Sequence, residues 1–229
     1  MEMLVTDFSG TYGAQGFLQA LEQRQAAVER CDFSSLDGTC CYCDPEARSR
    51  LEAALPEELP RLRFLDSGDY HYMSLLLALR ETEPFSLVLL DNHPDNQEPV
   101  FPGVLSCGSW VRDLREEQPL LREVLTIGPE GCPEDIPEGW LEARREERLY
   151  VSLDKDIMDR AYARTDWSQG RYTLAQVKDI LGRLMTGGKV VAADVCGEVS
   201  LSKGATPEDL RINLETNVEL YKFIINHLK

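Results

Sequence analysis

Two apolar runs in this chain end abruptly in carboxylates and a histidine. The run Phe85-Ser86-Leu87-Val88-Leu89-Leu90 is followed by Asp91-Asn92-His93-Pro94-Asp95, and the run Leu149-Tyr150-Val151-Ser152-Leu153 is followed by Asp154-Lys155-Asp156. Continuous apolar runs of this length are typical of strands that are buried on both faces, as in a parallel sheet. Carboxylates gathered where parallel strands end repel one another unless cations lie between them, and open α/β sheets bind ligands at that edge. The sequence therefore predicts a parallel sheet with a metal site at one edge.

Strands and helices alternate along the rest of the chain. Further strands are predicted at residues 3–7, 63–65, 124–127 and 190–195, and helices at 16–29, 46–54, 73–79, 174–185 and 207–227. The last helix is the clearest, because Thr206 can cap it, Pro207 fits its first turn and apolar residues recur on one face. This alternation predicts a three-layer α/β/α fold with a mostly parallel central sheet.

Length, charge and cysteine content narrow the class of protein. With 229 residues, of which 43% are hydrophobic, we expect one α/β domain over residues 1–229, with a Cys-rich surface loop at about 31–44. The formal net charge of -16 disfavours nucleic acid as a partner and favours a cationic or metal-bound ligand. No apolar stretch is long enough to cross a membrane and no signal peptide is evident at the start, so we expect a cytoplasmic protein without a membrane partner. The seven cysteines then fit free thiols in a reducing compartment.

The carboxylate clusters suggest a specific set of metal ligands. Asp91, His93 and Asp95 alternate, so in an extended segment all three side chains project to the same side. Asp154 and Asp156 repeat this pattern after a second strand, and a further histidine follows a third. The predicted metal ligands are four aspartates and two histidines: His71, Asp91, His93, Asp95, Asp154 and Asp156. Such a set could hold two divalent ions, and its hard oxygen ligands favour Mn²⁺, with iron, cobalt, nickel or zinc as substitutes.

These residues resemble the motifs of a known superfamily. The Asp91–Asp95 cluster resembles the Asp-x-His-x-Asp metal motif of the ureohydrolases, which include arginases, agmatinases and formimidoylglutamases. Ser152-Leu153-Asp154-Lys155-Asp156 resembles their Ser-x-Asp-x-Asp motif. Ser67-Gly68-Asp69-Tyr70-His71 looks like their Gly-Gly-Asp-His segment with one extra residue, and Asp194-Val195-Cys196-Gly197-Glu198-Val199 is similar to their Asp-x-x-Glu-Val segment, also with one insertion. The likeness spans about residues 66–229.

The resemblance implies an arginase-like fold and a metal-dependent hydrolase. Such an enzyme would cleave a C–N bond in a small cationic guanidino, amidino or formimino compound, using a hydroxide activated by two divalent ions, most often Mn²⁺. By the same resemblance, Asp95 would both ligate metal and accept the proton of that hydroxide, and Glu198 would hold the cationic end of the substrate. Family members are often oligomeric, which leaves a homo-oligomer open.

Departures from the family pattern keep two other functions open. Arginases and agmatinases carry a proton-shuttle histidine shortly after the Asp-x-His-x-Asp motif, whereas this chain has no histidine between His93 and His227. The corresponding stretch, Ser106-Cys107-Gly108-Ser109-Trp110, is closer to a Ser-Gly-Thr segment of formimidoylglutamases. One alternative is therefore a non-catalytic metal-binding or regulatory protein of the same fold. The other is an amine deacetylase with a single metal ion, against which Asp95 and Asp156 argue because one ion does not need them.

The cysteine-rich loop contains one further pattern. Cys40 and Cys43 have the Cys-x-x-Cys spacing of half a zinc site, but no second pair follows at a matching distance. This favours a packed loop over a structural zinc site of that type.

Overall fold

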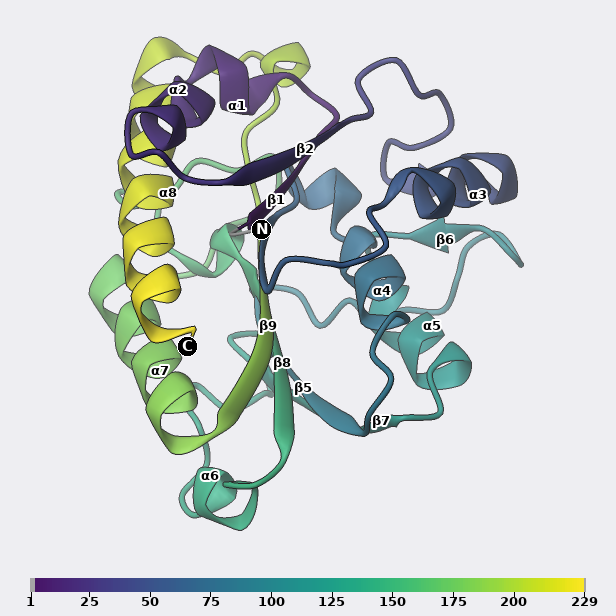
Figure 1. The fold of residues 1–229 in the computed structure, drawn as a ribbon, viewed down its shortest axis with the longest axis vertical. Coiled ribbons are helices and arrows are strands. Elements are labelled where there is room, and N and C mark those ends of the chain that lie inside the picture. The colour runs from purple at the N-terminus through teal and green to yellow at the C-terminus, as the bar shows by residue number, and fades with distance from the viewer. Residues whose placement is uncertain (1–2, 229) are drawn as a thin grey trace.

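The centre of the molecule is a sheet of seven parallel strands. The structure is a computed structural model that describes residues 3–228. The strand order is β2-β1-β4-β9-β8-β5-β7, so the last strand in the sequence occupies the middle of the sheet (Figure 1). The bounds are β1 (Met3–Asp7), β2 (Val28–Asp32), β4 (Leu62–Phe64), β5 (Phe85–Leu90), β7 (Leu121–Ile127), β8 (Arg148–Asp154) and β9 (Lys189–Cys196).

Helices cover both faces of this sheet (Figure 1). One face packs against α1 (Thr11–Ala14), α2 (Phe17–Glu22), α6 (Trp140–Ala143), α7 (Leu174–Gly187) and α8 (Pro207–His227). The other face packs against α3 (Pro45–Ala54), α4 (Met73–Ala78) and α5 (Trp110–Glu117). The predicted three-layer α/β/α fold with a parallel sheet is confirmed.

Burial on both faces explains the continuous apolar runs. In β8, Leu149, Val151 and Leu153 face the core under α7 and α8, whereas Tyr150 faces the core under α4 and α5. All six residues of β5 are buried, and its leucines and valine divide between the two cores in the same way. A strand with a helical layer on each side needs apolar side chains at successive positions rather than alternate ones.

The longest helix begins where the sequence predicts. Thr206 and Asp209 form a capping box at the start of α8: the Thr206 hydroxyl accepts from the Asp209 amide at 3.2 Å, and the Asp209 carboxylate accepts from the Thr206 amide at 3.0 Å. Pro207 occupies the first turn, where no amide donor is needed. The helix runs from Pro207 to His227, as predicted.

The predicted helix at residues 16–29 is wrong in its second half. Helix α2 ends at Glu22, the chain reverses at Gln25 in the left-handed region (φ 57°), and Val28 begins strand β2. This strand lies at the sheet's edge and buries only Cys31, so it lacks the apolar pattern of the central strands.

The cysteine-rich segment is also less irregular than expected. It contains the short strand β3 (Tyr42–Cys43), which pairs antiparallel with β6 (Leu105–Ser106). Three 3₁₀ helices, η1 (Gly68–Tyr70), η2 (Lys155–Ile157) and η3 (Leu201–Lys203), follow strands β4, β8 and β9. Within residues 3–228, none of the helices is both long and apolar enough to cross a membrane.

Candidate metal centre

The predicted metal ligands lie at the carboxyl ends of three strands near the middle of the sheet. His71 follows η1 after β4, Asp91 follows β5 directly, and Asp154 is the last residue of β8. The first aspartate of each motif also fixes the turn that follows it in the chain. Asp91 Oδ1 accepts from the His93 amide at 2.7 Å, and Asp154 Oδ1 accepts from the Asp156 amide at 2.8 Å. These turns return the later side chain of each motif to the same region as the first.

One cluster surrounds the buried imidazole of His71. Its Nδ1 lies 3.3 Å from Asp91 Oδ2, 3.0 Å from Asp95 Oδ2 and 3.5 Å from Asp154 Oδ2. Its other nitrogen, Nε2, is hydrogen-bonded to Ser152 Oγ at 2.9 Å. A metal-binding histidine is typically held in this way through the nitrogen that does not bind the metal. Nδ1 is thus directed at three carboxylates.

A second cluster surrounds His93. Its Nδ1 lies 2.8 Å from Asp156 Oδ2 and 3.6 Å from Asp91 Oδ1, and its Nε2 is hydrogen-bonded to Ser168 Oγ at 2.8 Å. Asp91 therefore belongs to both clusters, because Oδ2 faces His71 and Oδ1 faces His93. A carboxylate shared in this way can bridge two cations.

The electrostatics of the two clusters favour positive charge next to the aspartates. Burial raises the pKa of Asp154 well above its usual range, and the charges of Asp156 and Asp91 raise it further. Burial likewise raises the pKa of Asp156 to about 7, with the charge of Asp91 adding to the effect. Burial lowers the pKa of His71, but its hydrogen bonds to neighbouring carboxylates outweigh this and raise the pKa. The hydrogen bond to Asp156 raises the pKa of His93 to about 10. The site thus favours cations next to its carboxylates.

The donor set fits divalent metal ions. The buried Oδ2 atom of Asp91 lies 3.3 Å from His71 Nδ1 but accepts no well-aligned hydrogen bond among the described residues, which is unusual for a buried carboxylate oxygen. Two groups of three side chains each bring three possible ligand atoms within 4.8 Å of one another. One group is His71, Asp91 and Asp154, and the other is Asp91, His93 and Asp156. Carboxylate oxygens with a minority of imidazole nitrogens suit hard or borderline ions.

A cavity of about 220 Å³ opens above the two clusters. All six predicted metal ligands line it: His71, Asp91, His93, Asp95, Asp154 and Asp156. Its outer wall includes the thiols of Cys41 and Cys107 and the indole of Trp167. Of the two serines in the Ser106–Trp110 stretch, Ser106 lines the cavity, whereas Ser109 is buried and donates to Asp113 at 3.0 Å. The six predicted ligands thus line one cavity together.

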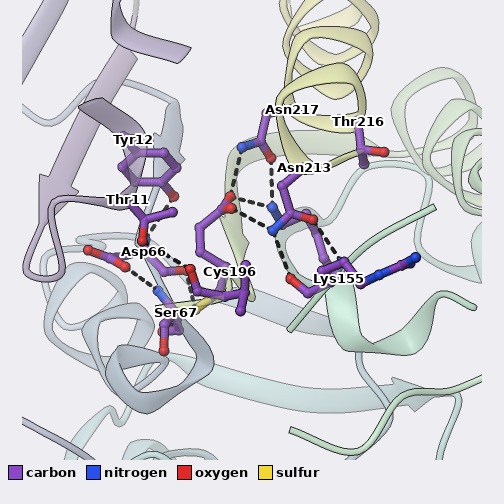
Figure 2. A network of polar contacts seen from close by, with 12 residues as sticks. Thr11, Tyr12, Asp66, Ser67, Lys155, Cys196, Asn213, Thr216 and Asn217 are labelled. Carbon is purple, nitrogen blue, oxygen red and sulfur yellow. Dashed lines mark hydrogen bonds and ion pairs between the residues drawn. The ribbon is translucent and has the colours of Figure 1, made fainter. Parts of the chain in front are cut away.

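Glu198 does not join them. It is absent from the described residues that line the cavity, and it is fully buried. Its carboxylate forms an ion pair with Lys155 and accepts from Asn213 Nδ2 at 2.9 Å and Asn217 Nδ2 at 2.7 Å (Figure 2). The arrangement gives no support to a contact between Glu198 and a substrate. It instead ties the backbone between Asp154 and Asp156 to helix α8.

Sequence reasoning missed Trp110, which holds two of the predicted ligands, Asp95 and His71. Trp110 Nε1 donates to Asp95 Oδ2 at 2.7 Å, and the Trp110 ring lies against the imidazole of His71 with 5.0 Å between centroids. The only signal for this residue was its place at the end of the Ser106–Trp110 stretch. Ser152, in contrast, is part of the Ser-x-Asp-x-Asp pattern, and its hydroxyl is the one that binds His71.

Comparisons with known proteins agree with this architecture. No known family profile matches the chain. An uncharacterized protein of Thermotoga maritima is 29% identical over 202 residues, which cover 85% of this chain and 78% of the relative. Three solved structures superpose with a TM-score of 0.66. They are a hypothetical agmatinase from Burkholderia thailandensis (16% identity, 99% of this chain and 86% of the other), proclavaminate amidino hydrolase from Streptomyces clavuligerus (19%, 99% and 92%) and an arginase from Bacillus caldovelox (15%, 96% and 98%).

The chain has the arginase-like fold. These structures belong to the ureohydrolase superfamily, so the resemblance seen in the sequence is confirmed at the level of the fold. The arginase-like fold also accounts for the position of the candidate site, because its parallel strands all end at the edge where the aspartates and histidines gather.

Proposed function

We propose that this protein is a metal-dependent hydrolase that cleaves a C–N bond in a small guanidino, amidino or formimino compound. The observation that carries the proposal is the Asp91 carboxylate shared between His71 and His93, with further aspartates on either side. Solved structures with the same fold are named agmatinase, arginase, proclavaminate amidino hydrolase and formimidoylglutamase, which supports this class of substrate.

The proposed cofactor is a pair of divalent ions, preferably Mn²⁺. His71, Asp91, Asp95 and Asp154 are proposed to hold one ion, and Asp91, His93 and Asp156 the other. When bound, such ions supply Lewis-acid chemistry and lower the pKa of water so that it can attack a planar carbon near neutral pH.

Asp95 is proposed to move the proton. It lines the cavity and is nearly buried, and Trp110 Nε1 fixes the orientation of its carboxylate through Oδ2. In this position it is proposed to accept the proton of the attacking water and to donate it to the departing amine. Trp110 is then a positioning residue for Asp95.

The cavity suits a small cation. Its lining is rich in carboxylates, including the rim residue Glu98, and the whole chain carries a formal charge of -16, which favours the approach of cationic substrates. Trp167 and Tyr42 supply apolar surface on the wall for an alkyl portion of the substrate. We assign Glu198 to positioning of the Asp154–Asp156 turn, since its carboxylate is already neutralised by Lys155.

One observation favours a second candidate, a non-catalytic metal-binding protein of the same fold. The sequestered Glu198, together with the lack of a histidine between His93 and His227 in the sequence, leaves fewer groups for proton transfer and substrate binding. A deacetylase with a single ion gains no such support, because Asp91 is shared between two groups.

The test combines metal analysis with a substrate screen. The protein is purified without chelator, incubated with Mn²⁺ and assayed for bound metal per chain and for release of ammonia or urea from guanidino, amidino and formimino compounds. We expect two ions per chain with turnover in the wild type, and loss of both in a variant with Asp91→Ala and Asp154→Ala. The exposed Asp179→Asn serves as the control. Two ions without turnover would favour the non-catalytic candidate, and no ions would contradict both.

A further inference from the structure

A second group of metal-binding side chains lies at the rim of the cavity, outside the aspartate and histidine clusters. It consists of Cys40, Cys41 and Asp69, whose ligand atoms all lie within 4.8 Å of one another. Cys40 is exposed, Cys41 is partly buried and lines the cavity, and Asp69 is buried. We propose that these three side chains bind a thiol-seeking divalent ion such as Zn²⁺, separate from the two ions of the proposed hydrolase centre.

The spacing of the ligand atoms matches this kind of ion. In a tetrahedral zinc site, Zn–S bonds of about 2.3 Å and Zn–O bonds of about 2.1 Å place the sulfur and oxygen roughly 3.6 Å apart. The Sγ atom of Cys40 lies 3.5 Å from Asp69 Oδ2. An ion can therefore enter between these two atoms without moving them apart. Each thiol that binds it releases one proton.

The Asp69 carboxylate is already oriented by other side chains. Trp167 Nε1 donates to Oδ1 at 3.0 Å, and Lys203 Nζ donates to Oδ2 at 2.6 Å. Carboxylates that ligate metals are commonly held by such outer hydrogen bonds. Lys203 also balances charge, because two thiolates and one carboxylate around a divalent ion leave one negative charge. Its side chain is 43% exposed and can shift as an ion binds.

The two cysteines are held by the backbone around them. The carbonyl of Thr39, just before Cys40, accepts from the buried Tyr72 hydroxyl at 2.6 Å. The carbonyl of Cys41 accepts from the Cys107 amide at 3.0 Å, where the β3–β6 pairing continues. Cys41 itself adopts a left-handed conformation (φ 59°), which is rare for a side-chain-bearing residue and frequent at functional sites.

The site differs from the Cys-x-x-Cys pattern in the sequence. Cys43 is buried in the core, with its sulfur 3.8 Å from the Asp44 carbonyl. The partner of Cys40 is therefore its neighbour Cys41, and the oxygen ligand comes from Asp69, which no sequence spacing indicates.

Cobalt(II) is the probe for the test, because thiolate–cobalt bonds give a charge-transfer absorption that aspartate and histidine ligands do not. The reduced, metal-free protein is titrated with cobalt(II). We expect the band in the wild type and also in a variant with Asp91→Asn and Asp154→Asn, which lacks the hydrolase centre. Cys40→Ser and Cys41→Ser should each lower the protein's affinity for cobalt(II), as followed by this band, by at least about tenfold. Cys132→Ser, which removes a partly buried thiol outside the group, should leave it unchanged.

A second measurement needs no variant. Zinc should protect Cys40 and Cys41 of the wild-type protein from alkylation, as measured by mass spectrometry of peptides. Absence of the cobalt band in the wild type, undiminished cobalt binding in either serine variant, or equal alkylation with and without zinc would overturn the proposal. Neither readout involves hydrolysis, so these results are independent of the proposed enzymatic activity.

Discussion

Replacing Asp91 with asparagine should remove the stabilisation provided by both ions of the proposed hydrolase centre. An ion present at 100 times its Kd stabilises the folded state by about 2.7 kcal/mol, so two ions contribute about 5 kcal/mol. For a chain of 229 residues, each kcal/mol raises the Tm by about 2–4 °C. We therefore expect Mn²⁺ to raise the Tm of the wild type by roughly 10–20 °C over the metal-free protein.

The structure predicts different losses for different aspartates. In Asp91→Asn the amide oxygen can still accept from the His93 amide, as Oδ1 does at 2.7 Å, but an NH₂ group can then take the place of the oxygen that faces His71. The turn is preserved while the shared ligand is lost, so the Mn²⁺-dependent shift should nearly disappear. Asp156→Asn alters only the cluster around His93 and should keep about half of the shift.

Thermal unfolding followed by circular dichroism, with Mn²⁺ and with chelator, measures these shifts. Asp179→Asn, on the exposed face of α7, should behave as the wild type does. If Asp91→Asn kept as much of the shift as Asp156→Asn, the shared role of Asp91 would be refuted. Equal Tm values of the wild type with Mn²⁺ and with chelator would refute the metal centre itself.

Two further substitutions test how the centre is held. A Cβ at Gly197 would lie 2.2 Å from Asp154 Oδ1, so Gly197→Ala should weaken Mn²⁺ binding in titration calorimetry by at least about tenfold. Gly204→Ala, at a glycine that also has a positive φ but no atom within 4 Å of its Cβ, should bind as the wild type does, and equal losses in the two variants would contradict the argument. Lys155→Met leaves the buried Glu198 without its countercharge and should cost about 3–5 kcal/mol in urea unfolding. Adding Glu198→Gln should recover most of this loss, and a double variant no more stable than the single one would exclude the ion pair as its cause.

The parts of the fold and site that the sequence predicted depend on short-range patterns. The buried strands β5 and β8 are continuous apolar runs, and the predicted ligands that follow them lie at the sheet edge because parallel strands end there together. Strand β2 was missed because an edge strand with one buried residue has no such pattern.

Long-range pairing of buried polar groups could not be predicted from the sequence. Lys155 and Glu198 are 43 positions apart, and their ion pair is completed by asparagines of α8. Such contacts have no periodicity, because they depend on how the loops after β8 and β9 meet the last helix. The hydrogen bond from Trp110 to Asp95 could not be predicted from the sequence for the same reason.

The place of β9 in the middle of the sheet has a consequence for synthesis of the chain. Before β9 leaves the ribosome, the strands can form only two separate fragments, β2-β1-β4 and β8-β5-β7, each with an unpaired inner edge. His71 belongs to the first fragment, whereas Asp91 and Asp154 belong to the second. The proposed metal centre can therefore assemble only after β9 has been synthesised, and until then the nascent protein exposes two strand edges that are prone to aggregation.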